Sequence, residues 1–400
     1  MKRSLFGYGL TTKALATLGG WDIYDDSFTC KSVDEYTNAL LPVADFDPNR
    51  SQLEIPSPGF PPHHPLVVKA RNIMSEYDFF APKMPHPIWI SGTNGKTTTT
   101  QMIAHLLAPQ GAIAGGNIGT PLAKLDPSAP LWVLETSSFT LHYTNIARAG
   151  IYVLLPIKPD HLSWHGDFRA YESAKLKPLQ SMRNGSVALL PKKYANLPTK
   201  AHIISYENSE DLARFLSIDL SDISIKEPFL MDALLALCVQ YILTGNHNIQ
   251  MMKSFKLDPH KLQELHDAKG RLWVNDTKGT NVDATIEALK RYSNRKIHII
   301  LGGDDKGVSL DTLFEVMKPL DVKIYAIGSN SDKLISLANR YSIEAKACYH
   351  LHKAVEAIDL ALDLNSVGLL SPAAASLDQF SSYIERGEQF MAQIKQISSS

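Results

Sequence analysis

A short glycine-rich loop constrains the fold of this chain more than any other feature. The residues Gly92-Thr93-Asn94-Gly95-Lys96-Thr97-Thr98 follow the apolar run 88–91 and precede a stretch of helical character. In a strand–loop–helix unit, the backbone N–H groups of such a loop wrap a phosphate chain, and the helix N-terminus adds positive potential. Lys96 can reach the terminal phosphates, and the Thr97 hydroxyl is placed for Mg²⁺. The loop therefore predicts a P-loop domain that binds a nucleotide.

Length and composition predict a multi-domain globular protein. The chain has 400 residues, enough for two or three domains, and its apolar fraction of 44% can build real cores. Forty basic and 41 acidic residues give a net charge of −1, which argues against nucleic acid or an anionic membrane as partner. The cysteines Cys30, Cys238 and Cys348 are odd in number and far apart, which favours a reducing compartment. With no targeting segment or membrane span expected, we predict a cytoplasmic protein.

The order of short segments predicts an α/β fold with three mostly parallel sheets flanked by helices. A strand at 4–6, the turn Gly7-Tyr8-Gly9, a helix and a strand at 21–24 resemble the start of a nucleotide-binding βαβ unit. Strands and helices alternate again after residue 88 and after residue 272, where the last helix is expected at 376–397. We predict an N-terminal Rossmann-like domain at 1–84, a central P-loop ATPase domain at 85–257 and a C-terminal Rossmann-like domain at 258–400.

Three further side chains of the central segment are candidates for metal or phosphate chemistry. Glu135 ends the apolar run 131–134, and an acid at the end of a strand next to a P-loop strand is suited to a nucleotide-bound Mg²⁺. His161 follows another apolar run, with an ordinary surface histidine as the alternative. Lys175 lies on the next predicted helix, and its alternative is a solvated lysine paired with Glu172 at spacing i,i+3.

Polar loops follow three strands of the third segment. They are Asn275-Asp276-Thr277-Lys278-Gly279-Thr280-Asn281, Gly302-Gly303-Asp304-Asp305-Lys306 and Leu370-Ser371-Pro372. Because the carboxyl ends of parallel strands meet at one edge, we expect these loops to converge where an open α/β sheet binds its ligand.

Taken together, the motifs of the chain resemble the Mur ligases. They are GTNGKTTTT, GGNIGTPL, LETSSFTL, KPDHLSWHGDFRAYESAK, NDTKGTN and GGDDKG, in this order along the chain. The ending LSPAAASLDQF, with Tyr383 and Arg386-Gly387 after it, is similar to the members of the family that add D-glutamate. The resemblance runs from about residue 1 to the last helix.

The resemblance implies a ligase of peptidoglycan synthesis that joins D-glutamate to UDP-N-acetylmuramoyl-L-alanine with ATP. The alanyl carboxylate attacks the γ-phosphate to give an acyl phosphate, and the amine of D-glutamate then displaces phosphate. Cations are needed at the γ-phosphate because two anions must approach each other. The resemblance also implies two Mg²⁺ ions, a Lys175 carbamate formed with CO₂, small-molecule substrates only, and a monomer.

Site roles carry over by motif position. The catalytic residues would be Lys96, Glu135, His161 and Lys175, and the metal ligands Thr97, Glu135, His161 and carbamylated Lys175. ATP would be bound by the loop 92–98 with Lys261, Asp276 and Lys278. The UDP-substrate would be bound by Gly9, Leu10, Thr11, Asp25, Asn117 and Ser137. D-glutamate would be bound by Thr280, Lys306, Ser376, Leu377 and Tyr383.

Other readings of the P-loop remain open from the residues. A folylpolyglutamate synthetase shares the short loop, the metal ligands and a glutamate co-substrate, but the first domain and LSPAAASLDQF favour the muramoyl substrate. A P-loop switch or metallochaperone would need no third α/β domain with a lysine-bearing ligand edge. A nicotinamide oxidoreductase is disfavoured because Thr12 stands at the third glycine of the dinucleotide motif.

Overall fold

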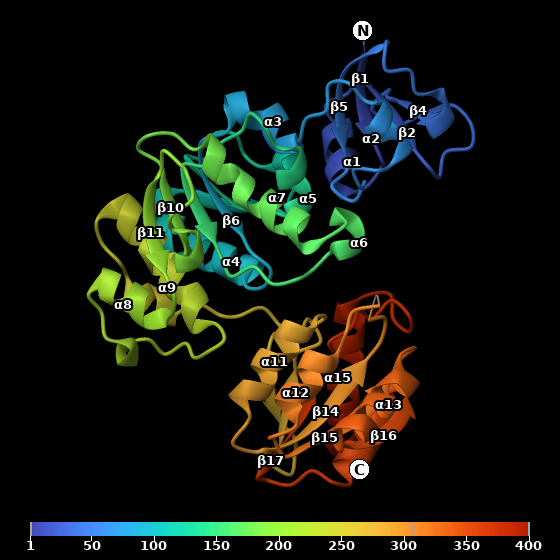
Figure 1. Ribbon diagram of the computed structural model, residues 1–400, viewed down its shortest axis with the longest axis vertical. Coiled ribbons are helices and arrows are strands. Elements are labelled where there is room, and N and C mark those ends of the chain that lie inside the picture. Colours follow the sequence, from blue (N-terminus) through green and yellow to red (C-terminus); the bar gives the residue numbers. More distant parts are fainter. Residues whose placement is uncertain (1, 118, 306, 399–400) are drawn as a thin grey trace. The chain divides into compact units, whose positions relative to one another are not determined.

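A computed structural model describes residues 2–117, 119–305 and 307–398. Their strands form three sheets, and the chain divides into two compact units, 1–255 and 256–400 (Figure 1). The first unit contains two of the sheets and the second unit contains the third. Within the described residues, no helix combines the length and the apolar character that crossing a bilayer requires.

The first sheet has five strands in the order β3-β4-β2-β1-β5, parallel except for the short β3. The predicted strands at 4–6 and 21–24 are confirmed as the central pair. Gly7, directly after β1, has φ 84°, and a Cβ there would lie 2.5 Å from the Phe60 ring. The first turn therefore requires glycine. The elements are β1 (Lys2–Phe6), α1 (Leu10–Ala16), β2 (Trp21–Asp25), β3 (Ser32–Val33), β4 (Ala39–Pro42), β5 (Ser51–Pro56), α2 (Pro65–Lys69) and α3 (Glu76–Phe80).

The second sheet has six parallel strands in the order β11-β10-β9-β6-β8-β7. Side chains of β6 alternate between two cores: Ile88 and Ile90 pack with α4 and α9, and Trp89 packs with α5 and α7. The elements are β6 (His86–Ser91), α4 (Lys96–Leu106), β7 (Ala112–Gly116), β8 (Leu131–Glu135), α5 (Ser138–Tyr143), β9 (Ile151–Leu154), α6 (Leu162–His165), α7 (Phe168–Ser181), β10 (Val187–Pro191), β11 (His202–Tyr206), α8 (Ser209–Leu216), α9 (Leu230–Thr244) and α10 (Ile249–Lys253).

The third sheet has six strands in the order β12-β13-β17-β14-β15-β16, and only β12 is antiparallel to its neighbour. The fold class predicted from the sequence is thus confirmed. The elements are β12 (Gln263–His266), β13 (Leu272–Asn275), α11 (Val282–Arg291), β14 (Lys296–Gly302), α12 (Asp311–Met317), β15 (Val322–Ile327), α13 (Ser331–Tyr341), β16 (Glu344–Tyr349), α14 (Leu351–Asp359), β17 (Ser366–Leu370) and α15 (Tyr383–Ser398).

The predicted start of the last helix at residue 376 is wrong, because α15 begins at Tyr383. The two serines before it end the preceding loop. Ser381 donates from its N–H (2.7 Å) and its hydroxyl (2.6 Å) to the Glu385 carboxylate, and the Ser382 hydroxyl accepts from the Glu385 N–H at 3.2 Å. These bonds satisfy groups at a helix N-terminus, so the helix starts after the serine pair.

Strand order decides which loops meet in the second sheet. Because β6 lies between β9 and β8, the P-loop after β6, Glu135 at the end of β8 and the segment after β9 share one edge. Such an edge is where parallel α/β sheets bind ligands. The central sheet therefore places the candidate residues of the central segment together.

A buried acid between the first two sheets gives the first prediction. Glu76 of α3 accepts a hydrogen bond from Ala123 N–H at 3.4 Å, and burial raises its pKa to about 8. This pKa lies above that of an unfolded glutamate, so the folded state holds the proton more tightly than the unfolded state does. The free energy of unfolding should therefore fall as pH rises from about 4.5 to about 8, by roughly 3–5 kcal/mol in total. Glu76→Gln should remove this loss, as measured by chemical denaturation at pH 5 and pH 9.

The matched control for this prediction is Glu210→Gln, at an exposed position of α8. Glu210→Gln should keep the pH dependence of the parent. The same loss of stability at high pH in Glu76→Gln as in the parent would contradict the assignment to Glu76.

Candidate functional site

The P-loop is shaped by two glycines that no other residue could replace without displacement. Gly92 has φ 142°, and a Cβ there would lie 2.4 Å from Leu155 Cβ. Gly95 has φ 83°, and a Cβ there would lie 2.5 Å from the carboxylate oxygen Oδ1 of Asp232. Gly95 also caps α4, whose first residue is Lys96. The loop thus leads its backbone directly into a helix N-terminus, the arrangement that binds phosphate.

Lys96 lies across this loop. Its ammonium donates to the carbonyl of Gly92 at 3.0 Å and to that of Thr93 at 2.7 Å. The Thr93 hydroxyl is in turn within 3.0 Å of the Tyr171 hydroxyl, which connects the loop to α7. The ammonium of Lys96 therefore lies on the predicted phosphate loop, and its contact with the terminal phosphates stays a prediction.

Glu135 provides an oxygen suited to a cation. The side chain is 3% exposed, and its Oε1 accepts from the Asn117 amide at 2.8 Å. Its Oε2 is buried and has no hydrogen-bond donor among the described residues. Leaving a carboxylate oxygen buried and unpaired is costly, and a bound cation would remove that cost. Glu135 therefore fits a Mg²⁺ site.

The described residues do not form a cluster of protein ligands around a metal ion. Among residues 2–117, 119–305 and 307–398, no three His, Cys, Asp or Glu side chains gather as a metal site. Mg²⁺ is commonly bound through one or two carboxylates with substrate phosphates and waters. The lone buried Glu135 oxygen beside the phosphate loop matches that pattern.

Lys175 is buried, so the alternative of a solvated lysine paired with Glu172 is wrong. Its side chain is 1% exposed, and its ammonium donates to the Gly92 carbonyl at 2.7 Å. Burial, with the nearby Lys96 charge, holds the pKa of Lys175 well below its usual value. Glu172 bonds instead to Tyr194 at 2.5 Å and Lys193 at 3.3 Å.

His161 lies at the start of α6 with its side chain 43% exposed and its Nε2 3.5 Å from Asp160 Oδ2. Its ring packs edge-on against Phe139 at 4.7 Å between centroids. His165 is more enclosed and bonds to the Ser138 hydroxyl at 2.9 Å. Burial, followed by the neighbouring His142, lowers the pKa of His165 to about 4. The two histidines therefore differ, and His161 is the more accessible one.

Two predicted substrate residues have structural partners of their own. Ser137 caps α5, its hydroxyl accepting from the Thr140 N–H at 3.0 Å, and the Asn117 amide donates to Glu135 as described.

In the first sheet, Gly9 caps α1 and the Asp25 carboxylate accepts from the Tyr8 N–H at 2.7 Å. Leu10, beside Gly9, is exposed. The loop at residues 7–9 is therefore held in place by Asp25, and the start of α1 is accessible to solvent.

One loop beside these residues was not among the site residues predicted from the sequence. It is the turn-rich segment 57–60, which packs on the loop at residues 7–9, with Ser57 Oγ 3.2 Å from where a Cβ of Gly9 would lie. It also contacts α6, because the Gly59 carbonyl accepts from the Trp164 indole N–H at 3.2 Å. The proline and glycine of this segment were the sequence signal that could have identified it.

In the third sheet the polar loops converge as predicted. The Ser371 hydroxyl donates to Asp276 Oδ2 at 2.7 Å, and burial raises the pKa of Asp276 to about 7. Asp304 and Ala375 exchange backbone hydrogen bonds of 3.0 and 2.9 Å. This bridge joins the loop after β14 to the loop after β17.

The predicted amino-acid residues of this unit differ in accessibility. Ser376 is buried and Leu377 is 71% exposed. Lys278 places its ammonium 5.7 Å from the Tyr383 ring, and its carbonyl accepts from the Thr280 N–H at 2.8 Å. Lys306 lies outside the described residues. Lys261 is buried, with its ammonium 3.6 Å from Asp258.

Arg386 belongs to the ending that carries the family resemblance, but the sequence assigned it no role. It is fully buried in α15, and burial lowers its pKa to about 10. Its guanidinium donates to the Thr277 hydroxyl (2.9 Å) and carbonyl (3.0 Å) and to the Ala374 carbonyl (3.2 Å). It thereby fixes two of the converging loops against each other.

Comparisons with known proteins agree with this geometry. Residues 90–250 match the Mur ligase middle domain. The MurF ligase of Thermotoga maritima in complex with ADP has the same fold, with a TM-score of 0.60 at 17% identity over 87% of this chain and 89% of that one. FolC of E. coli, in complex with DHPP and ADP, follows with a TM-score of 0.55 at 14% identity over 80% of this chain and 94% of that one.

Several relatives match over nearly their whole length. The UDP-N-acetylmuramoylalanine--D-glutamate ligase of Campylobacter jejuni (strain RM1221) is 54% identical, covering 99% of this chain and 100% of the relative. The enzyme of the same name from Helicobacter pylori (strain HPAG1) is 46% identical, covering 98% of this chain and 99% of the relative. With this similarity and the P-loop geometry, the chain belongs to the Mur ligases, in the family of the UDP-N-acetylmuramoylalanine--D-glutamate ligases.

Proposed function

We propose that this chain joins D-glutamate to UDP-N-acetylmuramoyl-L-alanine with ATP, in the synthesis of the peptidoglycan precursor. The observation that carries the proposal is the P-loop, where the Lys96 ammonium donates to the carbonyls of Gly92 and Thr93 and the buried Oε2 of Glu135 lacks a hydrogen-bond donor among the described residues. A lysine at a phosphate loop and a carboxylate oxygen suited to Mg²⁺ fit a reaction in which a carboxylate must approach a triphosphate. The full-length similarity to ligases of this name supports the two substrates.

The reaction follows from the charges. The alanyl carboxylate attacks the γ-phosphorus, ADP leaves, and an acyl phosphate forms. The amine of D-glutamate then attacks the acyl carbon, losing a proton, and inorganic phosphate leaves as the amide forms. Lys96 offsets charge on the transferring phosphoryl group, and the Gly92–Gly95 backbone orients the phosphate chain.

Thr97, Glu135, His161 and a carbamylated Lys175 would hold two Mg²⁺ ions, which supply charge neutralisation at the β- and γ-phosphates when bound. The lowered pKa of Lys175 supports the modification, since only a neutral amine reacts with CO₂. The buried, unpaired Oε2 of Glu135 supports its role as a ligand.

The remaining roles follow the family motifs. We propose three domains with boundaries near 84 and 257, a cytoplasmic monomer, and no nucleic-acid or membrane partner. ATP would be bound by residues 92–98, Lys261, Asp276 and Lys278. The UDP-substrate would be bound by Gly9, Leu10, Thr11, Asp25, Asn117 and Ser137. D-glutamate would be bound by Thr280, Lys306, Ser376, Leu377 and Tyr383.

The function is tested by phosphate release from ATP with UDP-N-acetylmuramoyl-L-alanine present, with and without D-glutamate. We expect release to require both substrates and mass spectrometry to show the glutamyl product. A folylpolyglutamate synthetase would instead extend a pteroate or folate acceptor with L-glutamate. Hydrolysis that is independent of any amine acceptor would contradict a ligase.

The amino-acid site gives the second prediction. Lys306→Ala and Ser376→Ala should each raise the KM for D-glutamate about tenfold or more, with a much smaller effect on the KM for ATP. An ammonium and a hydroxyl are suited to the side-chain carboxylate of glutamate, and a hydrogen bond to a charged group is worth ~1.5–3 kcal/mol. Steady-state kinetics with each substrate varied would measure this.

The control for the amino-acid site is Lys290→Ala, which removes an exposed lysine of the same unit paired with Glu287. Its kinetic constants should equal those of the parent. If the Lys306 and Ser376 variants were saturated by D-glutamate as readily as the parent, the site would lie elsewhere.

A further inference from the structure

Two polar side chains hold Glu135, and each comes from a different segment. Glu135 is the last residue of β8, where it is paired with Ile90 of β6 and Gly116 of β7. Its carbonyl accepts from the Tyr77 hydroxyl at 3.1 Å and from the Asn117 N–H at 2.9 Å. The side-chain amide of Asn117 donates to Oε1 of its carboxylate at 2.8 Å. Hydrogen bonds therefore fix both the backbone and the side chain of Glu135.

A glycine brings these groups together. Gly116 has φ 85°, and a Cβ there would lie 2.5 Å from the Glu135 carbonyl oxygen and 2.7 Å from the Tyr77 hydroxyl oxygen. Any other residue at this position would push the end of β7 away from both groups. The chain can therefore pass against the end of β8 and place Asn117 at the carboxylate.

Tyr77 connects the acid to the strand of the phosphate loop. It lies on α3 and is 2% exposed, and its ring packs edge-on against Trp89 with the centroids 5.2 Å apart. Trp89 belongs to β6, the strand that leads into the P-loop. A phenol hydroxyl is a donor at neutral pH, as its bond to the Glu135 carbonyl requires. One side chain thus contacts both strands that carry the nucleotide and metal groups.

The two carboxylate oxygens of Glu135 are unequal. An ionised carboxylate only accepts hydrogen bonds, so the Asn117 amide donates its N–H to Oε1. Oε2 is buried and has no donor among the described residues. One oxygen is therefore left for a cation. Mg²⁺ is small and demands near-ideal octahedral geometry, whereas Ca²⁺ is larger and readily accepts both oxygens of one carboxylate. A single available oxygen favours Mg²⁺.

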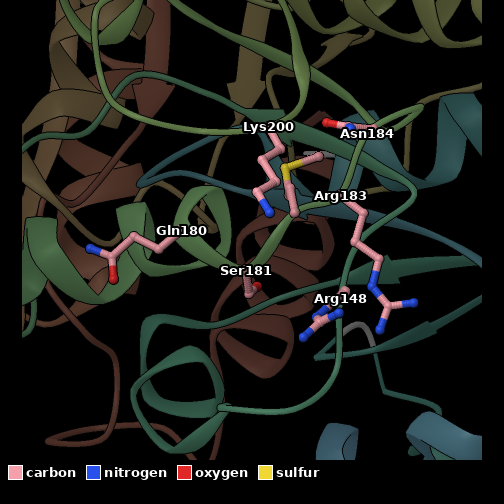
Figure 2. A pocket seen from close by; sticks show the side chains of 7 residues that line it. Arg148, Gln180, Ser181, Arg183, Asn184 and Lys200 are labelled. Carbon is pink, nitrogen blue, oxygen red and sulfur yellow. The ribbon is translucent and has the colours of Figure 1, made fainter.

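The opposite edge of the same sheet is unsuited to a cation. Arg148, Arg183 and Lys200 precede β9, β10 and β11, and they line a hollow of about 520 Å³ at the amino ends of these parallel strands (Figure 2). Among the described residues, those that line this hollow include no acid. Three positive charges would repel Mg²⁺. The carboxyl edge, where Glu135 lies beside the P-loop strand, is the edge suited to the metal.

We propose that Asn117 and Tyr77 are positioning residues of the Mg²⁺ site and set its preference for Mg²⁺ over Ca²⁺. Tyr77 fixes the backbone of Glu135, and Asn117 occupies Oε1, so that Oε2 alone is left for the ion. The inference rests on the proposed function in one respect, that Glu135 is a metal ligand. It gives Asn117 a role that exists before any UDP-substrate binds.

The test measures how much a metal tightens the binding of AMP-PNP, a non-hydrolysable ATP analogue, by calorimetry in Mg²⁺, in Ca²⁺ and in EDTA. Neither the UDP-substrate nor D-glutamate is present. Asn117→Leu removes the amide at similar volume and should weaken binding in Mg²⁺ about tenfold or more, with a smaller loss in Ca²⁺. Tyr77→Phe keeps the ring and should weaken binding in Mg²⁺ about threefold. Both variants should bind like the parent in EDTA.

Matched controls remove the same groups elsewhere in this unit. Tyr206→Phe removes a buried hydroxyl that donates to the Leu154 carbonyl at 2.8 Å, at the end of β9. Asn145→Leu removes an amide that donates to the Tyr143 carbonyl at 3.2 Å. Both should bind the analogue in Mg²⁺ like the parent. If Asn117→Leu failed to fold, Asn117→Ser would remove the amide with a smaller side chain.

Equal losses in Mg²⁺ and in EDTA would overturn the proposal, because the two residues would then only shape the phosphate loop. So would unchanged binding in Mg²⁺, a loss in Ca²⁺ as large as that in Mg²⁺, or a parent that binds no more tightly in Mg²⁺ than in EDTA. The measurement is independent of ligation. A parent with the expected metal dependence that formed no glutamyl product would refute the proposed function and leave this inference standing.

Discussion

Lys96→Ala is expected to abolish ligation while leaving the fold intact. The ammonium donates to the loop carbonyls of Gly92 and Thr93, and Lys96 is not part of either hydrophobic core that flanks β6. Its charge must offset the γ-phosphate when the acyl phosphate forms, and losing such a contact costs ~3 kcal/mol or more in the transition state. The kcat should fall at least about a hundredfold, as measured by phosphate release at saturating substrates.

The fold of the Lys96 variant is checked by its thermal transition, which should match that of the parent. Lys192→Ala, an exposed lysine paired with Glu207 in the same domain, is the matched control and should retain full activity. A folded Lys96→Ala that kept most of its kcat would show that another group carries the phosphate charge.

The phosphate loop was predictable because its signal is local. Glycines at fixed spacing, a lysine and a threonine between a strand and a helix determine the loop backbone, and Gly92 and Gly95 adopt positive φ as that motif requires. The order of strands and helices likewise predicted the fold class. Strand neighbours in the sheets, such as β8 and β9 on either side of β6, needed the tertiary structure.

Burial of polar side chains was harder to predict. Tyr171, Ala174, Lys175 and Pro178 form the buried stripe of α7, and their helical spacing was a signal that Lys175 faces the core. A charged residue on such a stripe is expected at the surface unless a partner is known, and its partner, the Gly92 carbonyl, is 83 residues away. The buried role of Arg386 was not predicted for the same reason, since its acceptors on Thr277 are 109 residues away.

Lys175→Ala is expected to be nearly inactive, and a short carboxylate such as acetate should restore part of the activity. An unmodified ammonium at this position would repel a metal ion, whereas a carbamate offers a negatively charged oxygen donor. The site favours the neutral amine that reacts with CO₂, because burial and Lys96 lower the pKa of Lys175. Phosphate release in bicarbonate-depleted and bicarbonate-supplemented buffer, with and without acetate, would measure both effects.

The control separates a lost carbamate from a lost buried side chain. Lys175→Met fills the space without an oxygen donor, so it should be as inactive as Lys175→Ala while keeping the parent's thermal stability, and acetate should not rescue it because the cavity is filled. Lys177→Ala, two residues along α7 and bonded to the His142 carbonyl, should remain active. Near-normal turnover of Lys175→Ala, or the absence of a carbamate mass at Lys175 in protein held under CO₂, would reduce Lys175 to a structural bond between α7 and the phosphate loop.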